Sequence, residues 1–105
     1  HIGAIPLHAA AHNDHIEVVR FLVEAGADMN TPAENGATPL YVAAQNGHIA
    51  VVRFLVEAGA DMNKASHIGA IPLHAAAQNG HIVVVRFLVE AGADMHKPKN
   101  NGATP

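Results

Sequence analysis

The segment Val18–Met29 reads VVRFLVEAGADM, and the same twelve letters return at Val51–Met62 and at Val84–Met95. The three copies begin 33 residues apart. Self-similarity at a fixed period of this size indicates a repeat architecture, in which each unit packs against its neighbours along the chain. We therefore interpret the 105 residues as a row of stacked units and not as a fold around one common centre.

Glycines in register divide the chain into units 3–35, 36–68 and 69–101, and the residues from Gly102 to Pro105 begin a fourth. The letters HIGAIP open units one and three, whereas NGATP opens unit two and the fourth start, so a 66-residue period overlies the shorter one. Recent tandem duplication or deliberate construction would produce this pattern. Because the chain starts without Met and stops early in a unit, we expect it to be a fragment of a longer array.

The composition excludes several classes of function. The chain has no cysteine, which removes disulfides, cysteine–zinc sites and thiol nucleophiles. The net charge is −3 and no basic stripe appears, so we expect no nucleic-acid partner. No 18-residue apolar run is present, so we expect no membrane partner either. The lack of cysteine and of a signal peptide favours an intracellular location.

Each unit has the signals of two short helices. In unit two, Thr38 is suited to be an N-cap, Pro39 to be the first helical residue, and Gly47 to end the helix. A second helix then runs from about His48 to Gly59, and a looped stretch leads to the next unit. The sequence thus predicts a helix, a turn and a second helix in every unit.

The second helix is apolar around most of its circumference. Its polar positions in unit one, Glu17, Arg20 and Glu24, follow an i, i+3, i+7 spacing and form one narrow stripe. A single helix pair cannot cover the remaining apolar surface, but identical units on either side can. The first helix is rich in alanine, so a small inner row beside a larger outer row would curve the stack. The predicted fold class is an all-α repeat solenoid.

At residues 36–63 the letters GATPLYVAAQNGHIAVVRFLVEAGADMN, with their two relatives, resemble the ankyrin repeat. The resemblance covers essentially the whole chain. It implies about three units, each a β-turn followed by two antiparallel helices, and a role in binding other proteins without a cofactor. The sequence departs from the family pattern where Ile5 and Ile71 replace the capping threonine, Tyr41 replaces a histidine, and Asp14 replaces a glycine after the first helix.

Histidines are the most tempting candidates for chemistry. His8 and His12 are four residues apart on a predicted helix, a spacing that can hold a metal ion. A structural metal normally has four ligands, and unit three lacks the second histidine because Gln78 replaces it, so we expect no metal site. The resemblance implies that His8 and His74 hydrogen-bond to a neighbouring turn. Three more histidines recur at the start of every second helix, which indicates a structural role: His15, His48 and His81.

Catalysis finds less support. Ser66 is the only serine and lies in a turn, and no nucleophile-elbow or phosphate-loop motif is present. Asp28, Asp61 and Asp94 recur within GAD, which favours hydrogen bonding in a turn. A general acid–base pair needs two carboxyls in different environments, whereas repetition gives each nearly the same one. We therefore expect no catalytic residue and no enzyme activity.

We expect the binding residues at positions whose side chains do not pack in the core of the stack. Asn-Gly is a strong turn signal, and turns project from the stack. Tyr41 is either a binding residue or a filler of the family's histidine position. The candidates on the turns are Glu34, Asn35, Ala37, His67, Ile68, Ala70, Asn100 and Asn101. The candidates on the inner faces of the first helices are His12, Asn13, Tyr41, Gln45, Asn46, Gln78 and Asn79.

We interpret the chain as a scaffold that binds another protein through its turn tips and concave inner face. Two alternatives stay open. The near-identity of the units favours a structural spacer within a long repeat protein, and an engineered scaffold is also compatible with the repetition. The outer faces of terminal units are usually polar. Here Val18, Val19 and Leu22 make the first unit as apolar as the middle one, so we also predict head-to-tail self-association.

Overall fold

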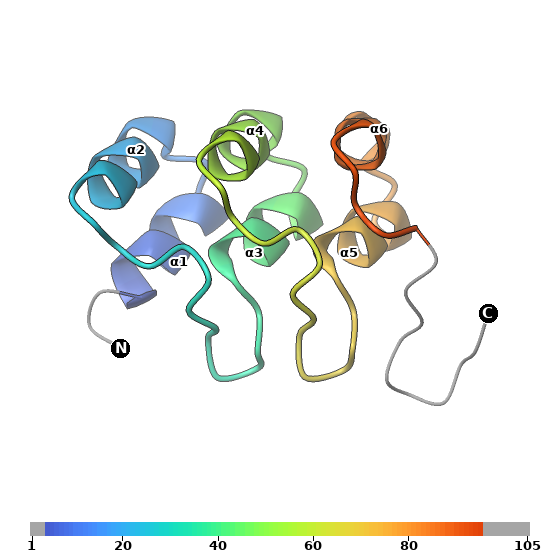
Figure 1. The fold of residues 1–105 in the computed structure, drawn as a ribbon, viewed down its shortest axis with the longest axis horizontal. Coiled ribbons are helices and arrows are strands. Elements are labelled where there is room, and N and C mark those ends of the chain that lie inside the picture. Colours follow the sequence, from blue (N-terminus) through green and yellow to red (C-terminus); the bar gives the residue numbers. More distant parts are fainter. Residues whose placement is uncertain (1–3, 96–105) are drawn as a thin grey trace.

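The computed structural model describes residues 4–95, and within this part of the chain the regular structure consists of six helices. They form three pairs laid out in a row, with one pair for each copy of the repeated segment (Figure 1). The pairs are α1 (Ala4–His12) with α2 (Ile16–Glu24), α3 (Pro39–Gln45) with α4 (Ile49–Glu57), and α5 (Pro72–Gln78) with α6 (Ile82–Glu90). The predicted all-α repeat solenoid is confirmed.

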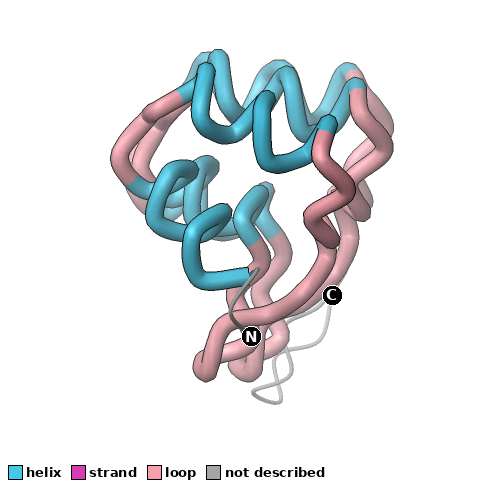
Figure 2. The backbone as a smooth tube through the Cα atoms, turned by 90° about the vertical axis from the view of Figure 1, so that its left-hand side faces the viewer, coloured by secondary structure: helices cyan, strands magenta, loops and turns pink. Residues whose placement is uncertain are grey.

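The helices lie in two layers. Figure 2, seen along the row, shows α2, α4 and α6 above and α1, α3 and α5 below, with the long loops reaching past the lower layer. We call α1, α3 and α5 the first-helix row, and α2, α4 and α6 the second-helix row. Contacts run along each row and within each pair, because every helix packs on its partner and on the matching helix of the next unit.

The predicted helix start signals act as expected in unit two and differ in the other two. Thr38 caps α3, where its Oγ1 accepts a hydrogen bond from the Tyr41 amide at 3.2 Å. Ile71 cannot do this for α5, and the Ile71 amide instead donates to Nδ1 of His74 at 3.0 Å. In unit one, α1 begins two residues before Pro6. A proline is tolerated there because amides of the first turn have no partner within the helix.

The first helix of each unit is followed, two residues after its end, by a residue with left-handed backbone. Gly47 and Gly80 both have φ +74°, and Asp14, in the same register, has φ +61°. Only glycine adopts this conformation without a steric cost, and aspartate bears it better than most residues. The prediction that Asp14 takes the place of a terminating glycine is confirmed.

One continuous apolar core runs between the two rows. Its largest fully buried side chains come from all three units: Leu7, Val19, Leu40, Val51, Val52, Leu55, Ile71, Val84 and Leu88. The expectation that every second helix is covered on several sides is right for α4 and wrong for the outer helices. Val51 and Val52 of α4 are both fully buried, whereas Val18 of α2 is exposed, because α4 alone has a second-row helix on each side.

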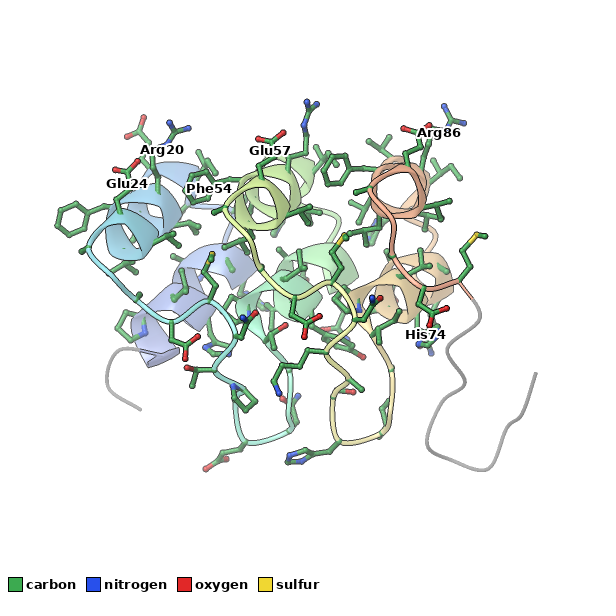
Figure 3. All side chains as sticks on the ribbon, viewed as in Figure 1. Arg20, Glu24, Phe54, Glu57, His74 and Arg86 are labelled. Carbon is green, nitrogen blue, oxygen red and sulfur yellow. The ribbon has the colours of Figure 1, made fainter. Side chains whose placement is uncertain are left out.

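The units are also joined by a cation–π contact that recurs along the second-helix row. The guanidinium of Arg20 lies 5.4 Å from the centre of the Phe54 ring, and that of Arg53 lies 5.7 Å from the centre of the Phe87 ring. In Figure 3, Phe54 sits between α2 and α4 and reaches toward the preceding unit. The same phrase in successive copies therefore supplies both partners of each contact.

Candidate binding surface

The loops between units fold into tight hairpins, which we call the hairpin tips (residues 33–37 and 66–70). In the first tip the Ala33 amide donates to the Ala37 carbonyl at 2.8 Å, and the Gly36 amide closes a β-turn on the Ala33 carbonyl at 2.8 Å. Oδ1 of Asn35 accepts from the Ala37 amide at 3.0 Å and tightens the turn. The second tip repeats both backbone bonds between Ser66 and Ala70 and from Gly69 to Ser66.

The two tips are bonded to each other. The His67 amide donates to the Asn35 carbonyl at 3.0 Å. Gly36 has φ +83°, and a Cβ built on it would lie 2.6 Å from the His67 nitrogen, so only glycine fits between the tips. Because each tip is closed internally and tied to the next, their spacing is set before any ligand arrives.

Four of the predicted tip residues are exposed. Glu34 and Asn35 are exposed on the first tip, and His67 and Ile68 on the second. Ile68 is 60% exposed, and it is the one large apolar side chain of the two described tips that is exposed to solvent. The tips thus present an acid and an amide on one unit, and an imidazole and an apolar group on the next. Asn100 and Asn101, predicted for a third tip, lie outside the described residues.

Three predicted contact residues are buried, and the expectation that their side chains lie on the surface is wrong. Ala37 and Ala70 are each 2% exposed, and Tyr41 is 8% exposed. They pack together with Ala75 between units two and three. The reason is that each tip turns back toward the stack at its fourth and fifth residues, so only the residues before the glycine project. Tyr41 is a packing residue in the position where units one and three have histidine.

An asparagine follows the C-terminal end of α1, α3 and α5, and its side chain has a structural role that the sequence analysis missed. Nδ2 of Asn13, Asn46 and Asn79 donates to the carbonyl four residues earlier at 2.9, 2.8 and 2.9 Å. Each of these carbonyls also accepts the backbone amide of the same asparagine, so the side chain adds a second hydrogen bond that secures the helix end. The signal was present as an asparagine in the same register of each unit. Gln45, Gln78 and His12 are exposed beside them.

The histidines hold neighbouring units together. Nε2 of His48 donates to the His12 carbonyl at 2.8 Å, and Nε2 of His81 donates to the Gln45 carbonyl at 3.0 Å. In the same way, Nε2 of His8 donates to the Ala37 carbonyl at 2.9 Å, across a unit boundary. The structural role predicted for His48 and His81 is confirmed, and so is the contact of His8 with a neighbouring turn. Within residues 4–95 no group of three or more His, Asp or Glu side chains could hold a metal ion.

The recurring aspartates bond within turns, as predicted. Oδ1 of Asp28 accepts from the Asn30 amide at 2.8 Å, and Oδ1 of Asn30 accepts from the Asp61 amide of the next unit at 2.9 Å. The same two bonds follow from Asp61 through Asn63 to Asp94. These carboxylates therefore belong to a ladder of turn hydrogen bonds that runs along the stack.

None of the helices in the described part of the chain is long and apolar enough to cross a membrane. The exposed candidates lie on the hairpin tips and at the C-terminal ends of α1, α3 and α5. In Figure 2 the tips project below the first-helix row, and the turns that follow these helices lie at the left. What the arrangement can do is present side chains on a preformed frame.

Comparison with known proteins gives two matches to family models and one to a curated protein. A model described as "Ankyrin repeats (3 copies)" matches residues 2–66, and one described as "Ankyrin repeat" matches residues 69–100. Alpha-latrocrustotoxin-Lt1a of Latrodectus tredecimguttatus is 59% identical over 29 residues, which make up 28% of this chain. Those residues span 2% of the toxin's length, so the likeness is that of single repeats.

Proposed function

Because this chain belongs to the ankyrin repeat family, whose repeats are generally protein–protein interaction modules, we propose that it is a non-catalytic scaffold with a defined protein-binding edge. The edge consists of the exposed residues of the hairpin tips and of the first-helix ends. The observation that supports this most is the contrast within each tip. Residues that the stack needs, such as Ala37 and Ala70, are buried, whereas Glu34, His67 and Ile68 contribute to no core.

Binding would proceed without chemistry. Ile68 supplies an apolar anchor, and Glu34 and His67 supply polar contacts around it, as in interfaces with an apolar centre and a polar rim. The bond from His67 to the Asn35 carbonyl holds these groups at a fixed spacing. A partner therefore meets a surface that loses little conformational freedom on binding, which favours affinity.

The test compares two variants with matched numbers of substitutions. The tip variant carries Glu34→Ala, His67→Ala and Ile68→Ala, and the control carries Glu24→Ala, Glu57→Ala and Glu90→Ala, three exposed positions on the second-helix row. Each immobilised chain captures proteins from the same extract, and captured proteins are quantified by mass spectrometry. We expect the tip variant to lose the proteins that wild type and control retain, with circular dichroism confirming that all three are folded. Unchanged capture by the tip variant contradicts the assignment of the edge.

The repetition of whole phrases favours a second function, that of a structural spacer. Residues 18–29 recur unchanged in all three units, whereas a surface tailored to one partner is expected to vary between units. The tips do vary, since Glu34 and Asn35 on the first correspond to His67 and Ile68 on the second. A spacer predicts that neither variant alters capture, so the same experiment separates the two functions.

A further inference from the structure

The face of the stack at α1 and α2 exposes residues that are covered in the other units. Val18 is 47% exposed, whereas Val51 and Val84, in the same register, are essentially fully buried. Phe21 is 69% exposed, whereas Phe54 and Phe87 are half-buried. From Val18, Val51 and Val84 onward the sequence of the three helices is the same, so the difference comes from the neighbour that units two and three have on this side. This face is shaped to receive another unit.

The face at α5 and α6 is its counterpart. Ala77 is exposed, although Ala11 and Ala44 in the same register are fully buried. Ile82 is 62% and Met95 is 57% exposed, while their equivalents in units one and two are half-buried and pack against the core. Both end faces therefore present apolar side chains that, inside the chain, form the interface between units.

Each specific contact of that interface joins two residues, and the two outward faces each carry one of them. Inside the chain an arginine of one unit lies over a phenylalanine of the next, as Arg20 does over Phe54. The repetition leaves Arg86 at one end and Phe21 at the other, each without its ring or guanidinium partner among the described residues. Figure 3 shows Arg86 on α6, at the opposite end of the row from α2.

A histidine contact is divided in the same way. His81 bonds the Gln45 carbonyl of the unit before it, and His48 bonds the His12 carbonyl. By register the Gln78 carbonyl is the next acceptor in the series, and His15 is the histidine of the first unit. The two end faces are thus complementary in apolar surface, in the cation–π pair and in this hydrogen bond.

We propose that the α5–α6 face of one copy binds the α1–α2 face of a second copy, with Arg86 over Phe21 of the second copy. His15 of the second copy then donates to the Gln78 carbonyl of the first. This inference goes beyond the proposed function, because the partner is a second copy of the chain and the surfaces are the outward faces of the first and last described helix pairs. Such a head-to-tail contact joins two different faces, so it generates open chains of copies and not closed pairs.

The test uses sedimentation of the full chain over a concentration series, from micromolar to millimolar, with Phe21→Glu, Arg86→Glu and a control, Glu24→Ala. We expect the mean mass of wild type and control to rise with concentration. Each of the two end variants should weaken association by at least about tenfold, because each removes a central contact. Wild type that stays monomeric overturns the proposal. Association of both single variants that is as strong as that of wild type also overturns it.

Mixing the two variants tests whether Arg86 of one copy pairs with Phe21 of another. In an equimolar mixture, the intact Arg86 of the Phe21→Glu variant can meet the intact Phe21 of the Arg86→Glu variant. The two remaining ends of that pair carry glutamate and cannot grow further. At a concentration at which each variant alone is monomeric, we therefore expect the mixture to form dimers and no longer species. A mixture that stays monomeric, or one that forms long chains, contradicts the assigned pairing.

Discussion

Alanine at Gly47 should destabilise the chain more than alanine at Gly80, although the two glycines have the same backbone. Both have φ +74° and both follow the first helix of a unit. An alanine in the left-handed region costs about 1–2 kcal/mol relative to glycine, and both variants incur this cost. The space around them differs. A Cβ at Gly47 would lie 2.6 Å from Nδ1 of His81, whereas a Cβ at Gly80 meets nothing within 4 Å.

The additional loss of stability at Gly47 comes from the hydrogen bond that His81 would lose. The imidazole is half-buried and bonds the Gln45 carbonyl at 3.0 Å, so moving it breaks a bond between units. A hydrogen bond of this kind contributes about 1 kcal/mol. We therefore expect Gly80→Ala to cost about 1–2 kcal/mol and Gly47→Ala about 2–3 kcal/mol. Urea unfolding followed by circular dichroism measures both free energies.

A double-mutant cycle identifies the origin of the difference. In a His81→Ala background the ring is gone, so Gly47→Ala should cost no more than Gly80→Ala. Equal costs for the two alanines in the wild-type background would refute the reasoning, because they would mean that the imidazole does not restrict the space at Gly47. A difference that persists without His81 would place the clash elsewhere.

Three further predictions use the same unfolding assay. Phe54→Ala should cost about 2 kcal/mol because the ring is half-buried beneath Arg20, whereas Phe21→Ala, at 69% exposure, should stay within about 0.5 kcal/mol; similar costs would contradict the stacking. Asp14→Gly should stabilise the chain by up to about 1 kcal/mol, since it removes the left-handed strain, and a loss of stability would show that the carboxylate matters more. Ser66→Ala should be neutral or stabilising by up to about 1 kcal/mol, because the buried Ser66 Oγ has no hydrogen-bond partner among residues 4–95, and a clear destabilisation would reveal one.

Much of the fold followed from local signals and their period. The threonine before α3, the proline that begins it, the glycine after it, and the aspartate in the same register of unit one each act as expected, because these residues determine backbone geometry directly. The period then required a row of units. The GAD aspartates were also predictable, since a side chain that bonds two residues ahead needs only local sequence.

The surface was harder to predict than the fold. Val18 and Val51 stand in the same phrase yet differ from half-exposed to buried, so no local pattern can distinguish them. Tyr41 looked like a contact residue because tyrosine often is one, and its burial depends on the neighbouring unit. The bond from His48 to the His12 carbonyl joins residues 36 apart, so it becomes visible only once the units are placed side by side.

The central claim is that position in the stack, and not local sequence, determines how well each copy of the repeated phrase is protected. Amide hydrogen exchange measured by NMR on the monomer tests it directly, because Leu22, Leu55 and Leu88 occupy the same place in identical segments. We predict that the Leu55 amide of α4, which has a neighbour on both sides, exchanges more slowly than the other two. Equal rates for the three amides, or slowest exchange at Leu22, would contradict the account.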